Sequence, residues 1–382
     1  MNRNILILIS AVCIILAAFS TVQAAKLPST ADQKIDPELA ELLAQEENGL
    51  ILAENIPVIV MLKSTVPSNP DRIIPEDLIS SDLTVRYRYN LIPGLAGEAT
   101  ANAIKKIAES DWVSGIYFDG RTQISSPDEN SFLEKSISNE EYISPAQTIK
   151  ADKLWEKGID GQGITVAVLD SGIDKNHPDL IGKVVAEKNF LADEITADDL
   201  LGHGTMVAGI IAGSGAASNG KYKGIAPGAK LISVKVIDGK GDGKVSDIIA
   251  GIEWAVYNGA DVLSLSLGGI NLGETNPPIT MAADNAAGAG VVVCVAAGNR
   301  NSSETRGQVT GTSSSQVGQD NTPVQLSQTG NGNNKDVYYL LVPIVLALPP
   351  GLIDSPGDGV KVITVGATDA NGHIASFSGS GP

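Results

Sequence analysis

The chain is poor in cysteine, in histidine and in basic residues. Two cysteines among 382 residues exclude a fold held together by a disulfide framework. The 27 Lys and Arg are outnumbered by 44 Asp and Glu, and the formal net charge of −17 argues against a nucleic-acid-binding protein, which needs a basic surface. The apolar share of 43% is ordinary for a globular protein, and the chain is long enough for two folded units.

Residues 1–24 have the pattern of a signal peptide. One positive charge precedes the almost wholly apolar run 5–19, which is too short for a membrane-spanning helix, and Val22-Gln23-Ala24 offers small residues at the usual cleavage spacing. Cleavage there would leave Cys294 alone. We therefore expect a secreted or extracellular protein with no internal disulfide and no stable membrane span. An uncleaved anchor that holds the protein at the cell envelope is the alternative.

Residues 25–122 are expected to form a small α+β unit. Apolar or alternating runs at 57–62, 84–90 and 113–118 predict strands, and apolar residues at helical spacing predict a helix over 98–110. Residues 123–141 are polar and charged without an apolar period. They predict an exposed linker, and proteolysis concentrates in segments of this kind.

From residue 142 onward, strand and helix patterns alternate. Near-continuous β-branched runs, typical of strands buried on both faces, are followed by helical patterns. This alternation predicts an α/β fold with a doubly wound, mostly parallel sheet, in which ligands bind at the carboxyl ends of the strands. The strand runs are 164–169, 231–236, 262–267 and 291–296, and the helical patterns are 247–257 and 280–289.

Three side chains with catalytic potential lie near the ends of these elements. Asp170 ends the first buried run, where a carboxylate is costly without a partner, and Asn299 follows the last run, where its amide could donate to an oxyanion. His203, one of three histidines, lies between two glycines at the start of a helix of small residues, a poor site for a merely packed imidazole. Taken singly, Asp170 could be a helix N-cap or turn residue, and Asn299 an ordinary turn asparagine.

Together these motifs resemble the subtilisin-like serine peptidases. Asp170 lies in Val-Ala-Val-Leu-Asp-Ser-Gly, His203 in Gly-His-Gly-Thr and Asn299 in Ala-Ala-Gly-Asn, with the aspartate before the histidine as in that family. The resemblance covers 142–382 apart from one stretch, and 25–122 resembles the family's propeptide. Supporting matches are His177-Pro178-Asp179-Leu180, Gly224-Ile225-Ala226-Pro227, Ile252-Glu253-Trp254-Ala255, Ser264-Leu265-Ser266-Leu267-Gly268-Gly269, Ile363-Thr364-Val365-Gly366-Ala367 and Ser376-Phe377-Ser378.

The resemblance implies a secreted serine endopeptidase that cleaves polypeptide substrates by acyl transfer. Asp170 would orient His203, His203 would move a proton to and from a serine, and Asn299 would stabilise the oxyanion. It also implies a ferredoxin-like propeptide that assists folding, blocks the cleft as an intramolecular inhibitor and is removed by cleavage within 123–140. The residues implied to bind substrate are Ser266, Leu267, Gly268, Gly241 and Gly243, with Gly298 at the floor of the specificity pocket.

The sequence departs from the family where the nucleophile belongs. The family serine lies in Gly-Thr-Ser-Met-Ala, at the start of a buried helix expected beyond residue 378, and the 382 residues contain no such motif. Gly311-Thr312-Ser313 is the only Gly-Thr-Ser, but no small-residue helix follows it, so Ser313 is not expected to act. We therefore expect 142–382 to be an incomplete peptidase domain that is inactive by itself. The coding sequence downstream of Pro382 would show whether the serine motif follows.

Other features are less specific. Residues 300–356 are expected to form an inserted loop with a short apolar patch at 337–348. Asp179 stands where relatives place a calcium ligand, but the rest of that site is not recognisable, so a structural calcium is left open and no metal or other cofactor is assigned. A non-catalytic protein that keeps the fold for binding or inhibition is the alternative function. Retention of an Asp–His pair that is costly to desolvate favours the peptidase.

Overall fold

The computed structural model describes residues 30–49, 55–63, 82–124, 145–269, 276–299, 353–368, 373–375 and 378–379. These residues form a six-stranded sheet, a four-stranded sheet and a two-stranded pairing. Within these ranges, no helix is long and apolar enough to cross a membrane. The expected signal peptide 1–24, most of the linker 123–141, most of the insertion 300–356 and Ser313 fall outside them, and those expectations stay predictions.

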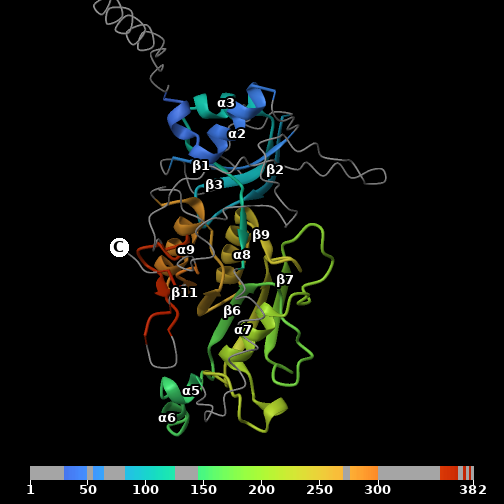
Figure 1. The fold of residues 1–382 in the computed structure, drawn as a ribbon, viewed down its shortest axis with the longest axis vertical. Coiled ribbons are helices and arrows are strands. Elements are labelled where there is room, and N and C mark those ends of the chain that lie inside the picture. The colour runs from blue at the N-terminus through green and yellow to red at the C-terminus, as the bar shows by residue number, and fades with distance from the viewer. Residues whose placement is uncertain are drawn as a thin grey trace, which may run out of the picture.

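The six-stranded sheet confirms the predicted α/β fold. Its strands are parallel in the order β12-β11-β10-β6-β8-β7, so the chain order reverses beside β6, where a ligand crevice is expected. Helices α8 and α9 cover one face, and α7 covers part of the other (Figure 1). The strands are β6 (Thr165–Asp170), β7 (Val184–Asn189), β8 (Lys230–Lys235), β10 (Val262–Leu265), β11 (Val292–Ala296) and β12 (Ile363–Val365). The helices in this part are α5 (Pro145–Thr148), α6 (Asp152–Trp155), α7 (His203–Ala212), η3 (Ala216–Ser218), α8 (Val245–Tyr257) and α9 (Pro278–Gly288).

Burial on two faces explains the near-continuous apolar pattern of β6. Ala167 and Leu169 pack into a core that includes α8 and α9, whereas Val166 and Val168 pack into a separate core with α7. Alternate residues of the strand therefore pack into opposite layers, and its four interior positions, 166–169, are all apolar.

The N-terminal unit, defined as the described residues from 30 to 124, contains an antiparallel sheet with the order β2-β3-β1-β4. Helices α2 and α3 share a core with one face of this sheet. The ferredoxin-like arrangement stays a prediction, because 64–81, between β1 and β2, lie outside the described residues. The elements are η1 (Asp32–Lys34), α2 (Pro37–Glu47), β1 (Ile56–Leu62), β2 (Leu83–Arg88), β3 (Gly94–Ala99), α3 (Ala101–Glu109), β4 (Val113–Phe118) and β5 (Arg121–Gln123).

The predicted helix over 98–110 began too early, because Glu98 and Ala99 belong to strand β3. Helix α3 starts after Thr100, whose side chain accepts a hydrogen bond from the N–H of Ala103. The sequence of β3, Gly-Leu-Ala-Gly-Glu-Ala, has no β-branched residue and did not suggest a strand. Glycine is needed there for space, because a β-carbon at Gly97 would collide with the carbonyl oxygen of Thr84 on β2.

The second face of the N-terminal sheet packs against the larger unit. Ile59, Tyr89, Ile92 and Ala96 belong to the same buried core as α8 and α9, and Figure 1 shows the N-terminal unit seated beside these two helices. The two units thus share a hydrophobic interface.

The α7 side of the larger sheet is less well covered beyond β10. Val292 on β11 and Ile363 and Val365 on β12 are 46%, 53% and 52% exposed, although the parallel pairing places them on the face that α7 covers over β6.

Candidate active site

Asp170 lies at the carboxyl end of the central strand β6 and is 1% exposed. Its backbone carbonyl accepts hydrogen bonds from the N–H groups of Val236 and Ile237, and its Oδ1 accepts one from the N–H of Ser171 at 2.7 Å. A buried carboxylate needs partners for its charge. The main partner is His203, whose Nδ1 lies 2.8 Å from Oδ1 and 2.9 Å from Oδ2.

His203 is the first residue of α7, and its side chain is 18% exposed. The two glycines that flank it are required for different structural reasons. Gly202 has a φ of +89°, a conformation that favours glycine, and a β-carbon at Gly204 would collide with the carbonyl oxygen of Gly172. The Gly-His-Gly spacing therefore brings the imidazole close to the end of β6.

The surroundings of His203 favour its protonated form. Burial lowers the pKa of His203, but the hydrogen bond and charge of Asp170, together with the charge of Asp199, outweigh it and raise the pKa above its ordinary value. The bond to Asp170 also determines the tautomer: Nδ1 carries the proton toward the carboxylate, which leaves Nε2 as the basic nitrogen of the neutral ring.

Asp199, which the sequence did not single out, holds the start of α7 in place. Its carboxylate accepts hydrogen bonds from the N–H groups of Leu201, Gly202 and Thr205 and from the hydroxyls of Thr205 and Ser171, at 2.6–3.0 Å. Burial raises the pKa of Asp199, but these bonds outweigh it and lower the pKa below its ordinary value. An acid a few residues before a helix of small residues is a capping signal that could have identified it.

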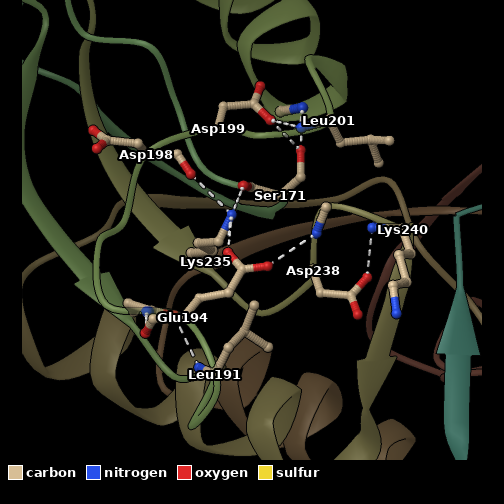
Figure 2. A network of polar contacts seen from close by, with 12 residues as sticks. Ser171, Leu191, Glu194, Asp198, Asp199, Leu201, Lys235, Asp238 and Lys240 are labelled. Carbon is tan, nitrogen blue, oxygen red and sulfur yellow. Dashed lines mark hydrogen bonds and ion pairs between the residues drawn. The ribbon is translucent and has the colours of Figure 1, made fainter. Parts of the chain in front are cut away.

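A buried lysine forms hydrogen bonds that connect the loop containing Asp199 to the ends of β6 and β8. Lys235 ends β8 opposite Asp170, and its side chain is fully buried. Its Nζ donates to the carbonyl oxygens of Ser171 at 2.6 Å and Asp198 at 2.8 Å and pairs with Glu194 Oε2 at 3.0 Å (Figure 2).

Glu194 connects this lysine to a second loop. Its other oxygen, Oε1, accepts the N–H of Gly239 at 3.0 Å. Gly239 precedes strand β9 (Asp242–Lys244), which contains Gly243, one of the residues predicted to bind substrate. Lys235 and Glu194 together therefore link the Asp–His pair to the loop before β9.

The predicted substrate strand is paired with the chain's own N-terminal unit. β5 runs antiparallel to β9, with Thr122 opposite Gly243, and the N–H of Ile124 donates to the carbonyl oxygen of Gly241 at 2.9 Å. Thr122 is buried between Gly243 and Gly269. A β-carbon added at Gly243 would lie 3.4 Å from its hydroxyl oxygen, and one added at Gly269 would lie 3.1 Å from its methyl group. An extended segment therefore lies along this edge.

A family model described as the subtilase family (peptidase S8) matches residues 161–382 of the chain. The chain belongs to the subtilase family. The match contains the Asp170–His203 pair, the Lys235 network and β9, so the geometry and the family assignment concern the same part of the molecule.

Curated subtilases are similar to this chain over different lengths. Serine protease AprX of Bacillus subtilis is 32% identical over 318 residues, which cover 78% of this chain and 58% of that protein. The major intracellular serine protease of Bacillus subtilis is 43% identical over 165 residues (42% and 50%), and subtilisin DY of Bacillus licheniformis is 35% identical over 233 residues (61% and 66%). The chain thus spans about half to two thirds of the length of these relatives.

The remaining predicted site residues of this subtilase lie at the same edge of the sheet as Asp170. Ser266 and Leu267 directly follow β10, and Asn299 follows β11 after Gly298, whose φ is +92°. Because β6, β10 and β11 are parallel, their carboxyl ends meet at one edge. The structure thus gathers Asp170, His203, Asn299 and the 266–268 segment at one edge of the sheet.

Asp179, which the sequence left open as a calcium ligand, makes a hydrogen bond to the neighbouring short helix η3. Asp179 Oδ1 accepts the N–H of Ala217 at 2.7 Å. In the described part of the chain, no group of three or more His, Cys, Asp or Glu side chains is arranged to hold a metal ion.

Proposed function

We propose that this subtilase is the precursor of a secreted serine endopeptidase, in which residues 25–122 act as a propeptide. The hydrogen-bonded Asp170–His203 pair at the end of β6 is the observation that carries the proposal. A protein that used the fold only for binding would gain nothing from a carboxylate that is 1% exposed and must be compensated by an imidazole.

The proposed chemistry is acyl transfer to a serine. Neutral His203 accepts the hydroxyl proton at Nε2 as the serine oxygen attacks the peptide carbonyl, and returns it to the leaving amine when the C–N bond breaks. Asp170 holds the imidazolium that forms between these steps, and the side-chain amide of Asn299 donates to the oxyanion. Water then hydrolyses the acyl ester by the same proton route.

The chemistry needs a serine that the described residues do not include. The 382 residues contain no Gly-Thr-Ser-Met-Ala motif, and Ser313 lies outside the described ranges. We propose that the nucleophile belongs to a Gly-Thr-Ser-Met-Ala helix beyond residue 378 of the full gene product, and that residues 1–382 alone do not hydrolyse peptides.

The pairing of β5 with β9 supports the inhibitory role of the N-terminal unit. A substrate bound as an extended strand would need the same backbone groups of Gly241 and Gly243 that β5 and Ile124 occupy. Processing after Ile124, within the segment 125–140, would leave 121–124 bound as a product strand until the propeptide dissociates.

Hydrogen bonds between α8 and the N-terminal unit support stable docking of that unit on the larger one. The Glu253 carboxylate accepts the N–H groups of Asn90 and Leu91, both at 2.6 Å, and the Asn90 side-chain amide at 3.1 Å. Asp119 accepts the N–H of Ser246 at 2.8 Å and its hydroxyl at 2.6 Å, as a cap at the start of α8.

Labelling with a fluorophosphonate probe tests the proposed activity. Residues 1–382 should remain unlabelled, whereas a product that continues through a Gly-Thr-Ser-Met-Ala helix should be labelled and should hydrolyse casein after propeptide removal. Labelling of Ser313 would overturn the placement of the nucleophile. A stop codon directly after Pro382 in the native gene would favour the non-catalytic alternative.

Glu253→Gln should weaken the docking of the N-terminal unit. The variant replaces a charged acceptor of three hydrogen bonds with a neutral one, and charge-assisted bonds to a partly buried group contribute about 1.5–3 kcal/mol each. Hydrogen exchange at the Asn90 and Leu91 amides should become at least ten times faster. Glu187→Gln, at an exposed position on β7, is the matched control and should leave both amides unchanged.

A further inference from the structure

One acidic residue lies between the segment predicted to bind the substrate backbone and the glycine predicted at the floor of the specificity pocket. The N–H of Asp354 donates to the carbonyl oxygen of Ala297, beside Gly298. The next residue, Ser355, exchanges both backbone hydrogen bonds with Gly269, at 3.0 and 3.1 Å. Asp354 therefore joins the segment after β10 to the segment after β11.

The side chain of Asp354 occupies the space that two glycines leave free. A β-carbon at Gly298 would collide with Oδ2 and Cγ of Asp354, and one at Gly268 would lie 3.0 Å from its Cβ. Gly298 is the residue predicted for the floor of the specificity pocket, and Gly268 belongs to the segment predicted to bind the substrate backbone. Asp354 is 6% exposed, so its carboxylate lies buried between these two glycines.

The neighbouring acids have other roles. Asp358 accepts the hydroxyls of Thr280 and Ser355, both at 2.7 Å, and Asp284 accepts the N–H groups of Val360 and Lys361. Of these three carboxylates, Asp354 is the one in contact with the pocket glycines.

We propose that Asp354 is a specificity-determining residue, which selects substrates with lysine or arginine on the amino side of the cleaved bond. The inference rests on the proposed peptidase function and names its substrate class. A carboxylate at the base of a narrow pocket stabilises a cation there, because the pair forms in a region of low dielectric, whereas a large apolar side chain would leave it facing hydrocarbon. An aspartate at the base of the corresponding pocket gives trypsin the same preference.

Ligand binding tests the pocket without any need for a nucleophile. Residues 1–382 are titrated with benzamidine, a planar cation that mimics the arginine head group, and with neutral, isosteric benzamide, and heats of binding are measured. Benzamidine should bind at least ten times more tightly than benzamide. Asp354→Asn should remove this difference, whereas Asp354→Glu should retain part of it. Asp193→Asn, which removes an exposed charge from the same protein, is the matched control and should bind as the parent does.

The outcomes separate the pocket from the catalytic proposal. Equal, measurable binding of the two ligands, or unchanged benzamidine binding by a folded Asp354→Asn variant, would each overturn the role of Asp354, whether or not the protein is labelled by a fluorophosphonate. If neither ligand binds while the N-terminal unit covers the cleft, the peptide substrates below decide. In a form that does hydrolyse peptides, kcat/KM for arginine relative to leucine before the cleaved bond should fall at least tenfold on Asp354→Asn. If Asp354→Asn does not fold, Asp354→Glu provides the test. In that variant kcat/KM for arginine divided by kcat/KM for leucine should be lower than in the parent but remain above one.

Discussion

Asp170→Asn is expected to lower peptide hydrolysis by the active form about 10⁴-fold, the loss typical of removing this carboxylate from a Ser-His-Asp triad. Asp170 lies 2.8 Å from Nδ1 of His203 through Oδ1 and 2.9 Å through Oδ2. An asparagine can present its N–H₂ group to Nδ1 and so stabilise the tautomer in which Nε2 carries the proton. That tautomer cannot accept the proton of the serine hydroxyl. The measurement is kcat/KM on a peptide substrate.

The same substitution should change the titration of His203 in a defined direction. In the parent, Asp170 helps to raise the pKa of His203 above 6.5 against the effect of burial. This interaction stabilises the folded state fully below pH 6.5, and the contribution is lost as the pH rises through the pKa of the folded state. Activity needs the neutral ring, so it should rise over that same pH range.

In Asp170→Asn the main charge is gone and burial remains, so the pKa of His203 should fall. Nuclear magnetic resonance of the imidazole carbons follows this change in residues 1–382, where no nucleophile is needed. His177→Gln and His373→Gln assign the other two imidazoles, and the signal of His203 in both controls should titrate as in the parent. An unchanged pKa in Asp170→Asn would contradict the coupling of the two side chains.

Lys235→Met is expected to destabilise the protein by about 3–5 kcal/mol, which is typical of removing one partner of a buried ion pair. Methionine fills a similar volume but leaves the Glu194 carboxylate without its cation and the carbonyl oxygens of Ser171 and Asp198 without this donor. Urea denaturation followed by circular dichroism should show a clearly lower midpoint. Lys240→Met, at an exposed side chain in the next loop, should have little effect.

A second substitution tests whether the unpaired charge is the cause. Adding Glu194→Gln to Lys235→Met removes the buried charge but keeps an oxygen that can accept the N–H of Gly239. The double variant should recover a substantial part of the lost stability, since the largest penalty comes from an uncompensated charge. If it is as unstable as the sum of the two single variants, the loss must come from packing instead.

The Lys235 network also has a positional consequence. It holds the carbonyl next to Asp170, the loop before Asp199 and, through Glu194, the loop before β9. A Lys235→Met variant that still folds should therefore show a changed imidazole environment at His203, although the described partners of Lys235 are Ser171, Asp198 and Glu194.

The fold class and the Asp–His pair were predictable because their signals are local. Continuous runs of β-branched residues are typical of strands that are buried on both faces. The ends of β6, β8, β10 and β11 could therefore be placed within one residue, except that the run 262–267 continues two residues beyond β10. Asp170 ends one such run and His203 lies between glycines, so both positions could be named before their contact was known. The family motifs then joined them with Asn299.

Strand β3 and strand β7 were missed for a different reason. In β3, Gly97 is required by the close approach of β2, and the residue that causes the requirement is distant in the sequence. In β7, Val-Val-Ala-Glu-Lys-Asn is partly exposed along an edge of the sheet, so its apolar signal is weak. Propensity cannot report a constraint that comes from a partner strand.

The amino-acid sequence by itself determined the family, the α/β class, the net negative charge and which residues we propose for proton transfer, because each depends on residue types or on their short spacing. Only the tertiary structure decided what lies next to them. It brought Lys235 and Glu194 under the Asp170 loop, laid β5 along β9 and placed Asp354 against Gly298 and Gly268. These contacts join residues that are far apart in the sequence, and their free energy depends on burial and distance, which no local pattern encodes.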